Sequence, residues 1–144
     1  MSTLRRDAMP RDWAAMKALT RDVRIWLKAR GISDGVQYVA EVVLEEMLAN
    51  AVEHGGQGEV SVATLIEGQR IVLCFEDTGP AFDPASQPPR FPQLDSCGTG
   101  GLGLHHVRAL AQDMKYERIG VRNVVTVIVD RRLALPSSLH GAGQ

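Results

Sequence analysis

The sequence predicts an α+β fold, a two-layer α/β sandwich in which a mixed, mostly antiparallel sheet carries three helices on one face. Two observations predict this class. Apolar residues follow the order helix, helix, two strands, helix, two strands along the chain. The strand segments of each pair are joined by only a few residues, around Gly68 and Gly120, which is typical of antiparallel hairpins. Helices layered on one face of such a sheet form a sandwich rather than a doubly wound fold.

Two helices are predicted in the N-terminal part of the chain. Apolar residues recur at helical intervals from Arg11 to Arg30, and the segment stops at Gly31, a residue that commonly ends a helix. Ser33 or Asp34 can cap a second helix, because a short polar side chain accepts a hydrogen bond from the first free N–H groups. This helix is expected to continue to about His54, before a pair of glycines.

The remaining elements are four strands and a third helix. Runs rich in Val, Ile and Leu predict two strand pairs with a helix-like segment between them. The predicted strands are Glu59–Glu67, Arg70–Glu76, Met114–Ile119 and Val121–Arg131, and the predicted helix is His105–Gln112. Residues 1–135 are expected to form a single domain, and the small, polar residues 136–144 are expected to be a disordered tail.

The most informative segment runs from Gly98 to Leu104, with the sequence Gly-Thr-Gly-Gly-Leu-Gly-Leu, directly before the third helix. Glycines let the main chain approach a ligand closely, and the free N–H groups at a helix start attract an anion. The pattern therefore indicates phosphate binding. It also fits the dinucleotide-binding pattern G-x-G-x-x-G. However, the preceding Pro88, Pro89 and Pro92 exclude a central strand, and no acidic residue follows at the required distance.

Three polar residues of the second helix lie at the edge of its apolar face. Glu46, Asn50 and His54 are spaced four residues apart, so they form a row along one side of the helix. A buried carboxylate or amide without a partner costs roughly a few kcal/mol, so the row favours a ligand, an ion or a protein partner. The alternative is an amphipathic helix whose polar edge happens to contain these residues, and the helix alone does not decide between the two.

A further polar position, Asp77, lies at the end of a strongly apolar strand and opens a long loop, residues 77–100. A carboxylate there can accept a hydrogen bond from an exocyclic amine, and Gly79 would let a flat ring lie close to the backbone. The alternative is an aspartate that only starts a turn, which is common. A loop of this length inside a compact domain is usually functional or mobile.

Composition and charge narrow the class of protein. The 144 residues carry a net charge of −1 and no run of Lys or Arg, so no nucleic-acid partner is expected. No apolar run is long enough to span a bilayer and the N-terminus lacks the apolar core of a signal peptide, so no membrane contact is expected.

Cys74 and Cys97 do not have a metal-ligand spacing, and Cys74 is expected to be a small buried apolar residue. This cysteine usage favours a reducing, cytoplasmic location.

Three of these features occur in the order found in the GHKL ATPase superfamily, which includes gyrase, histidine kinases and the MutL repair proteins. Glu46-x-x-x-Asn50-Ala51-x-x-His54 resembles its N box, and Asp77-x-Gly79-Pro80-x-Phe82 resembles its G1 box. Gly98-x-Gly100-Gly101-Leu102-Gly103-Leu104 resembles its G2 box. Three motifs in order are more specific than any one of them. The resemblance covers roughly residues 10–132 and implies the Bergerat, or histidine-kinase-like ATPase, fold, with its first strand reduced to Thr3–Ala8.

Within the superfamily, the chain looks most like the anti-sigma-factor serine kinases of bacterial partner-switching systems. The stretches that carry this resemblance are Asn50–Gly55, Gly101–Val107, Tyr116–Arg118 and Arg122–Thr126.

The resemblance implies a role for each candidate residue. Glu46 would be the general base, Asn50 would hold Mg²⁺, and His54 would lie near the phosphates of ATP. Asp77 would bind the adenine amine, with Gly79 packed beside the ring. The phosphate-binding residues would be Gly98, Thr99, Gly100, Gly101, Leu102 and Gly103, and residues 80–100 would form the ATP lid. The family's threonine that supports adenine has no direct counterpart, and its place falls on Asn123 or on Thr126.

The resemblance therefore implies an ATP- and Mg²⁺-dependent protein serine/threonine kinase that phosphorylates a small anti-sigma-factor antagonist and also binds a sigma factor. A homodimer is expected on the same ground. Two alternatives stay open. One is a stand-alone ATPase module of the histidine-kinase type, which would need a phosphoacceptor domain from another chain. The other is a non-catalytic switch protein that uses ATP only to set its shape. Glu46 favours the kinase, because a pure binding module needs no base.

Overall fold

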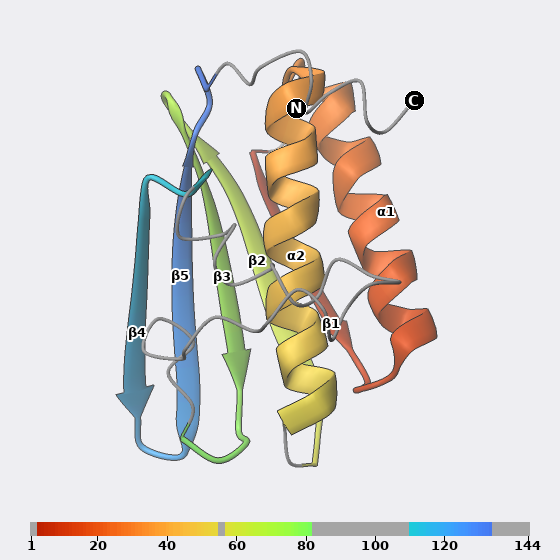
Figure 1. Ribbon diagram of the computed structural model, residues 1–144, viewed down its shortest axis with the longest axis vertical. Coiled ribbons are helices and arrows are strands. Elements are labelled where there is room, and N and C mark those ends of the chain that lie inside the picture. Colours follow the sequence, from red (N-terminus) through yellow and green to blue (C-terminus); the bar gives the residue numbers. More distant parts are fainter. Residues whose placement is uncertain (1–2, 55–56, 82–109, 134–144) are drawn as a thin grey trace, which may run out of the picture.

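The computed structural model describes residues 3–54, 57–81 and 110–133. The elements of these residues are, in chain order, β1 (Leu4–Met9), α1 (Trp13–Ala29), α2 (Asp34–His54), β2 (Val60–Glu67), β3 (Arg70–Asp77), β4 (Asp113–Ile119) and β5 (Arg122–Asp130). The two helices lie side by side on one face of a single sheet (Figure 1). The predicted α+β sandwich is therefore confirmed, and its short first strand is present as β1.

The sheet has the strand order β1-β2-β3-β5-β4, and every neighbouring pair among the described strands is antiparallel. The predicted, mostly antiparallel sheet is therefore confirmed, and no parallel pair occurs among the described strands. Both hairpins turn at a glycine, Gly68 with φ of 58° and Gly120 with φ of 61°. This left-handed backbone is one that glycine adopts without a steric cost, so each turn closes in two residues and the strands return antiparallel.

Side-chain caps fix where the helices begin. The Asp12 carboxylate accepts a hydrogen bond of 2.7 Å from the Ala15 N–H, so α1 starts at Trp13. The Ser33 hydroxyl accepts a bond of 3.3 Å from the Val36 N–H at the start of α2. Because α1 starts after Asp12, Arg11 belongs to the connection between β1 and α1 rather than to the helix predicted over it.

The hydrophobic core lies between the helical layer and the sheet. Val36, Val43 and Leu48 of α2 are completely buried, as are Leu73 of β3 and Val127 of β5. Burial of each such side chain stabilises the fold by roughly 1.5–3 kcal/mol. The core therefore holds α2 firmly against the central strands, and the polar residues of α2 keep a fixed position relative to the sheet.

The predicted third helix lies outside the described residues except at its end. Leu110 is helical, whereas Ala111 and Gln112 are not, so the predicted end at Gln112 was wrong. The Gln112 N–H donates a 2.7 Å hydrogen bond to the Ile128 carbonyl, which draws this residue into the sheet just before β4.

Candidate functional site

One end of the sandwich brings together parts of the chain that are far apart in the sequence. β3 ends there, β5 begins there, and the last turn of α2 lies beside the connection into α1 (lower end in Figure 1). Asp77 and Asn123 face each other directly across the β3–β5 ladder. The G1 motif and the C-terminal half of the N motif are therefore found at the same end of the molecule.

The helix side of this site consists of Glu46 and Asn50 on α2. Their exposed fractions are only 4% and 6%, so both lie on the side of the helix that faces the protein interior. Because they are one helical turn apart, an oxygen of each can approach the same ligand. The third member of the predicted row, His54, is the last residue of α2, and its side chain lies outside the described part of the structure.

The strand side is centred on the carboxylate of Asp77. Its Oδ1 accepts hydrogen bonds from the Gly79 N–H, at 3.1 Å, and from Asn123 Nδ2, at 2.8 Å. Its Oδ2 lies 3.6 Å from Nη1 of Arg11, an ion-pair contact that is longer than a hydrogen bond. The two oxygens therefore differ: one is bound within the protein and the other retains acceptor capacity. A turn aspartate alone would show only the bond to Gly79.

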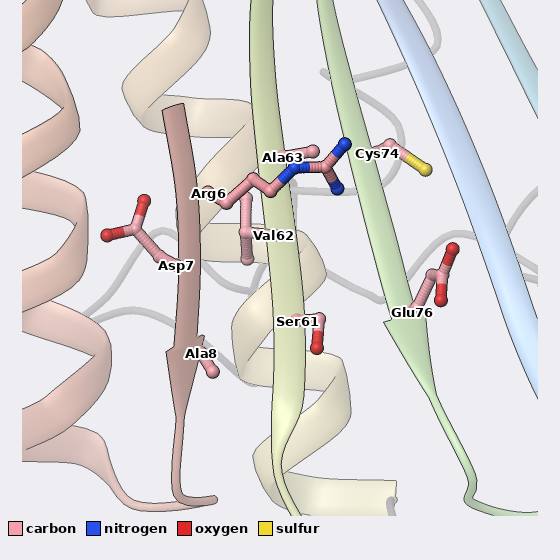
Figure 2. A pocket seen from close by; sticks show the side chains of 8 residues that line it. All are labelled: Arg6, Asp7, Ala8, Ser61, Val62, Ala63, Cys74 and Glu76. Atoms are coloured by element: carbon pink, nitrogen blue, oxygen red, sulfur yellow. The ribbon is translucent and has the colours of Figure 1, made fainter. Parts of the chain in front are cut away.

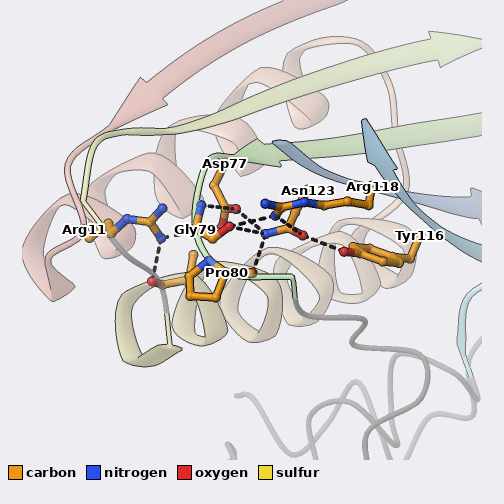
Figure 3. Close-up of polar contacts among 8 residues, drawn as sticks. Arg11, Asp77, Gly79, Pro80, Tyr116, Arg118 and Asn123 are labelled. Carbon is orange, nitrogen blue, oxygen red and sulfur yellow. Dashed lines mark hydrogen bonds and ion pairs between the residues drawn. The ribbon is translucent and has the colours of Figure 1, made fainter. Parts of the chain in front are cut away.

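Asn123 is the centre of a polar network that holds the G1 motif in place (Figure 3). Besides Asp77, its Nδ2 donates to the carbonyls of Gly79, at 3.3 Å, and Pro80, at 2.8 Å. Its Oδ1 accepts from the Tyr116 hydroxyl, at 2.6 Å, and from Arg118 Nη1, at 3.1 Å. Arg118 Nη1 also donates to the Gly79 carbonyl at 2.8 Å.

This network separates the two residues proposed for the position of the family's threonine. Asn123 is 6% exposed and contacts Asp77. Thr126 lies opposite Cys74, on the other face of the sheet, and its hydroxyl is 4.0 Å from the Cys74 sulfur. Asn123 is thus the residue beside Asp77. Because both ends of its amide are already bonded within the protein, it orients Asp77 and the turn after it rather than offering a free donor to a ligand.

Arg11 connects the two sides of the site. Its Nη1 donates a 2.8 Å hydrogen bond to the carbonyl of Ala51, the residue after Asn50, and faces Asp77 Oδ2. The site residues predicted from the sequence did not include Arg11, Tyr116 or Arg118. An arginine before a helix cap gives no sequence signal of such a contact. Tyr116 and Arg118 are two residues apart, so both side chains lie on the same face of β4. Only the β4–β5 register shows that this is the face of Asn123.

The third family motif, the glycine-rich segment, falls outside the described part of the chain. Gly98, Thr99, Gly100, Gly101, Leu102 and Gly103 lie outside the described residues, as does the predicted lid beyond residue 81.

Within the described ranges, no three His, Cys, Asp or Glu side chains gather as a metal-binding cluster. Neither α1 nor α2 is both long enough and apolar enough to cross a membrane.

A pocket on the open face of the sheet is separate from this site (Figure 2). Arg6 of β1 extends across β2 toward Cys74 of β3 and passes beside Ala63, and Ser61 lines the pocket further along β2. Cys74 is half-buried on this face, so the expectation of a core cysteine was wrong. Burial raises the pKa of its thiol, which disfavours the reactive thiolate form. We assign no function to this pocket.

Comparison with known families is consistent with this geometry. The family described as "Histidine kinase-like ATPase domain" matches residues 9–129, which is most of the chain and includes both sides of the site. The protein therefore belongs to the histidine kinase-like ATPase domain family. Comparison with curated protein sequences gives no match.

Solved structures share the fold at low sequence identity. One is the structure of the RsbU and RsbW domains of Rv1364c from Mycobacterium tuberculosis, with a TM-score of 0.67 and 16% identity over 90% of this chain. Another is the histidine kinase AdeS of Acinetobacter baumannii, with a TM-score of 0.50 and 17% identity, also over 90% of this chain. The chain spans 32% of the mycobacterial structure and 68% of the AdeS structure. These likenesses concern the fold.

Proposed function

We propose that the protein is an ATP- and Mg²⁺-dependent serine/threonine kinase of a cytoplasmic partner-switching system, which phosphorylates a small antagonist protein and binds a sigma factor. The observation that carries the proposal is the meeting of two family motifs at one end of the sandwich. Arg11 Nη1 contacts both the Ala51 carbonyl, next to Asn50, and Asp77 Oδ2. A nucleotide bound there has its base at Asp77 and its phosphates toward α2.

Base recognition rests on Asp77. The Oδ2 atom can accept a hydrogen bond from the 6-amino group of adenine, while Oδ1 is kept in place by Gly79 and Asn123. A carboxylate offers only acceptors, so it favours adenine over a base with a carbonyl at the same position. The triphosphate would then extend to the glycine-rich motif Gly98–Gly103, whose N–H groups suit phosphate oxygens.

The residues of α2 fit a magnesium ion. The ion prefers oxygen ligands and is usually held by one or two protein side chains together with phosphate oxygens and water. Asn50 supplies an amide oxygen from a nearly buried position, and Glu46 places a carboxylate one turn away. Asn50 would hold the ion, and when bound the ion neutralises charge on the transferring phosphoryl group.

Glu46 is the proposed general base. A hydroxyl oxygen of the acceptor serine or threonine attacks the γ-phosphorus of ATP, and the bond from that phosphorus to the bridging oxygen breaks. The hydroxyl proton passes to the Glu46 carboxylate, and ADP leaves. A positioned base of this kind contributes about 10²–10⁴-fold to the rate. The remaining acceleration comes from holding both reactants in line.

The experiment that tests the proposal is incubation of the protein with ATP labelled at the γ-phosphate, Mg²⁺ and a candidate antagonist protein. Transfer of label to a serine or threonine of the antagonist is the expected result. Label on a histidine would instead support a histidine-kinase-type module. Binding of ATP without transfer would support the non-catalytic switch, and absence of ATP binding would contradict the proposal as a whole. Light scattering of the same samples tests the expected homodimer.

A further inference from the structure

Arg11 is a buried cation where the β1–α1 connection meets α2 and β3. It lies between β1 and α1, its side chain is 9% exposed, and its Nη1 contacts Ala51 at the end of α2 and Asp77 at the end of β3. Its Nε and Nη2 atoms are also buried, and within the described residues they have no hydrogen-bond partner. Figure 3 shows the guanidinium directed toward Asp77 and Gly79.

This arrangement is poor for stability. A buried guanidinium needs a counter-ion, and each buried N–H group without an acceptor reduces the stability of the fold. An arginine that served only to stabilise the connection would have its donors satisfied by carbonyl groups. Here Nη1 donates one hydrogen bond of 2.8 Å to the Ala51 carbonyl and lies 3.6 Å from Asp77 Oδ2. The position of Arg11 is therefore better explained by what it does to Asp77.

Arg11 orients the carboxylate of Asp77. Gly79 and Asn123 hold Oδ1, and the positive charge of Arg11 attracts Oδ2 toward the last turn of α2. Without Arg11, Oδ2 would lose the only charged group that faces it among the described residues. The contact to the Ala51 carbonyl also fixes the spacing between the Asp77 carboxylate and the Asn50 region of α2.

We propose that Arg11 is a positioning residue for base recognition, which orients Asp77 Oδ2 toward the 6-amino group of adenine and sets its distance from α2. This inference rests on the proposed function. It is specific, because it predicts that Arg11 matters for nucleotides with a 6-amino group and not for nucleotide binding in general.

The test is calorimetric titration of the full chain with ATP and with purine riboside triphosphate, which lacks only the 6-amino group. The Arg11→Met variant is expected to bind ATP about tenfold or more weakly, the usual effect of losing a hydrogen bond to a charged group. Its affinity for the analogue is expected to stay close to that of the wild type. In an Asp77→Asn background, Arg11→Met is expected to have no further effect on ATP binding.

Two controls keep the result interpretable. Arg24→Met removes another arginine–carboxylate contact, the 2.7 Å pair with Glu41 between α1 and α2, and is expected to leave both affinities unchanged. Arg11→Lys keeps the charge and is expected to restore most of the preference for ATP. Arg11→Gln removes the charge but keeps a donor for the Ala51 carbonyl, and it replaces Arg11→Met if that variant does not fold.

An equal loss of affinity for both nucleotides in the Arg11 variants would show a merely structural role and overturn the inference, as would an unchanged preference for ATP in Arg11→Met. Either result would leave the proposed function standing, provided that the wild type binds ATP. A wild type that binds neither nucleotide would overturn both.

Discussion

The two sides of the candidate site are built in different ways. On the helix side, Glu46 and Asn50 are neighbours on one turn of α2, so their spacing in the sequence is enough to bring them together. On the strand side, Asp77 and Asn123 come from different strands and Arg11 from a third part of the chain. On the helix side, each residue can therefore be replaced without displacing the other. On the strand side, each residue is held by the others, so one substitution affects the whole network.

The largest expected effect is on the helix side. Glu46→Gln keeps the size of the buried side chain but removes the base, so phosphoryl transfer is expected to fall by about 10²–10⁴-fold while ATP affinity stays nearly unchanged. Labelled transfer and calorimetry measure the two quantities separately. Glu45→Gln, the neighbouring half-exposed carboxylate, is the matched control and is expected to transfer at the normal rate. Phosphoryl transfer at the normal rate by Glu46→Gln would contradict the role of Glu46 as the general base.

The next largest effect is on the strand side, and on binding rather than rate. In Asp77→Asn, an amide N–H₂ replaces the acceptor Oδ2 and faces both Arg11 and the adenine amine. ATP affinity is expected to fall by about 10–100-fold, as for the loss of a hydrogen bond to a charged group. The control is Glu76→Gln, on the same strand but at the open-face pocket. Undiminished ATP binding by Asp77→Asn would mean that adenine binds at another place in the protein.

A third prediction concerns the network itself. Asn123→Ala leaves the carbonyls of Gly79 and Pro80 and the Tyr116 hydroxyl without their amide partner, so we expect a loss of unfolding free energy of about 1–3 kcal/mol. Chemical denaturation measures this loss. Thr126→Ala, three residues away on the opposite face, is expected to have little effect. Equal stability of the two variants would mean that the network is not a structural unit.

The smallest effect is a pH dependence on α2 outside the site. Burial, with a contribution from Glu41, raises the pKa of Glu45, and Lys17 opposes this shift only in part. The folded state therefore holds this proton more tightly than the unfolded state, which gives stability at low pH that is lost as pH rises through the raised pKa. Glu45→Gln is thus expected to melt slightly higher than the wild type at neutral pH, with the difference vanishing in acid. A constant difference at all pH values would contradict this.

Local patterns in the sequence predicted most of the fold and brought the helix-side residues together. The four-residue spacing of Glu46 and Asn50 predicted a row at the edge of the apolar face, and the structure shows that both side chains are buried. Gly68 and Gly120 indicated the hairpins, which turn there. Asp12 and Ser33 cap the two helices. Ser33 was one of the two predicted caps of α2, whereas Asp12 was not predicted, because the first helix was expected to begin at Arg11, one residue before it.

The strand side needed the three-dimensional structure because its contacts depend on register and on long-range approach. Asn123 was the predicted counterpart of the family's threonine and Thr126 the alternative, and only the β3–β5 ladder shows that Asn123 lies opposite Asp77. Cys74 lies in an apolar run, but strand alternation turns it to the open face, between Leu73 and Phe75 of the core. Arg11 approaches Asp77 only because β1 and α1 bring their connection to the end of α2.

A crystal structure with Mg²⁺ and a non-hydrolysable ATP analogue would test the proposed binding site directly. We expect the adenine amine to lie within about 2.7–3.2 Å of Asp77 Oδ2, and the metal about 2.0–2.1 Å from the side-chain oxygen of Asn50. A nucleotide bound at the open-face pocket, or a cleft between Asp77 and α2 filled by the protein's own side chains, would contradict this expectation.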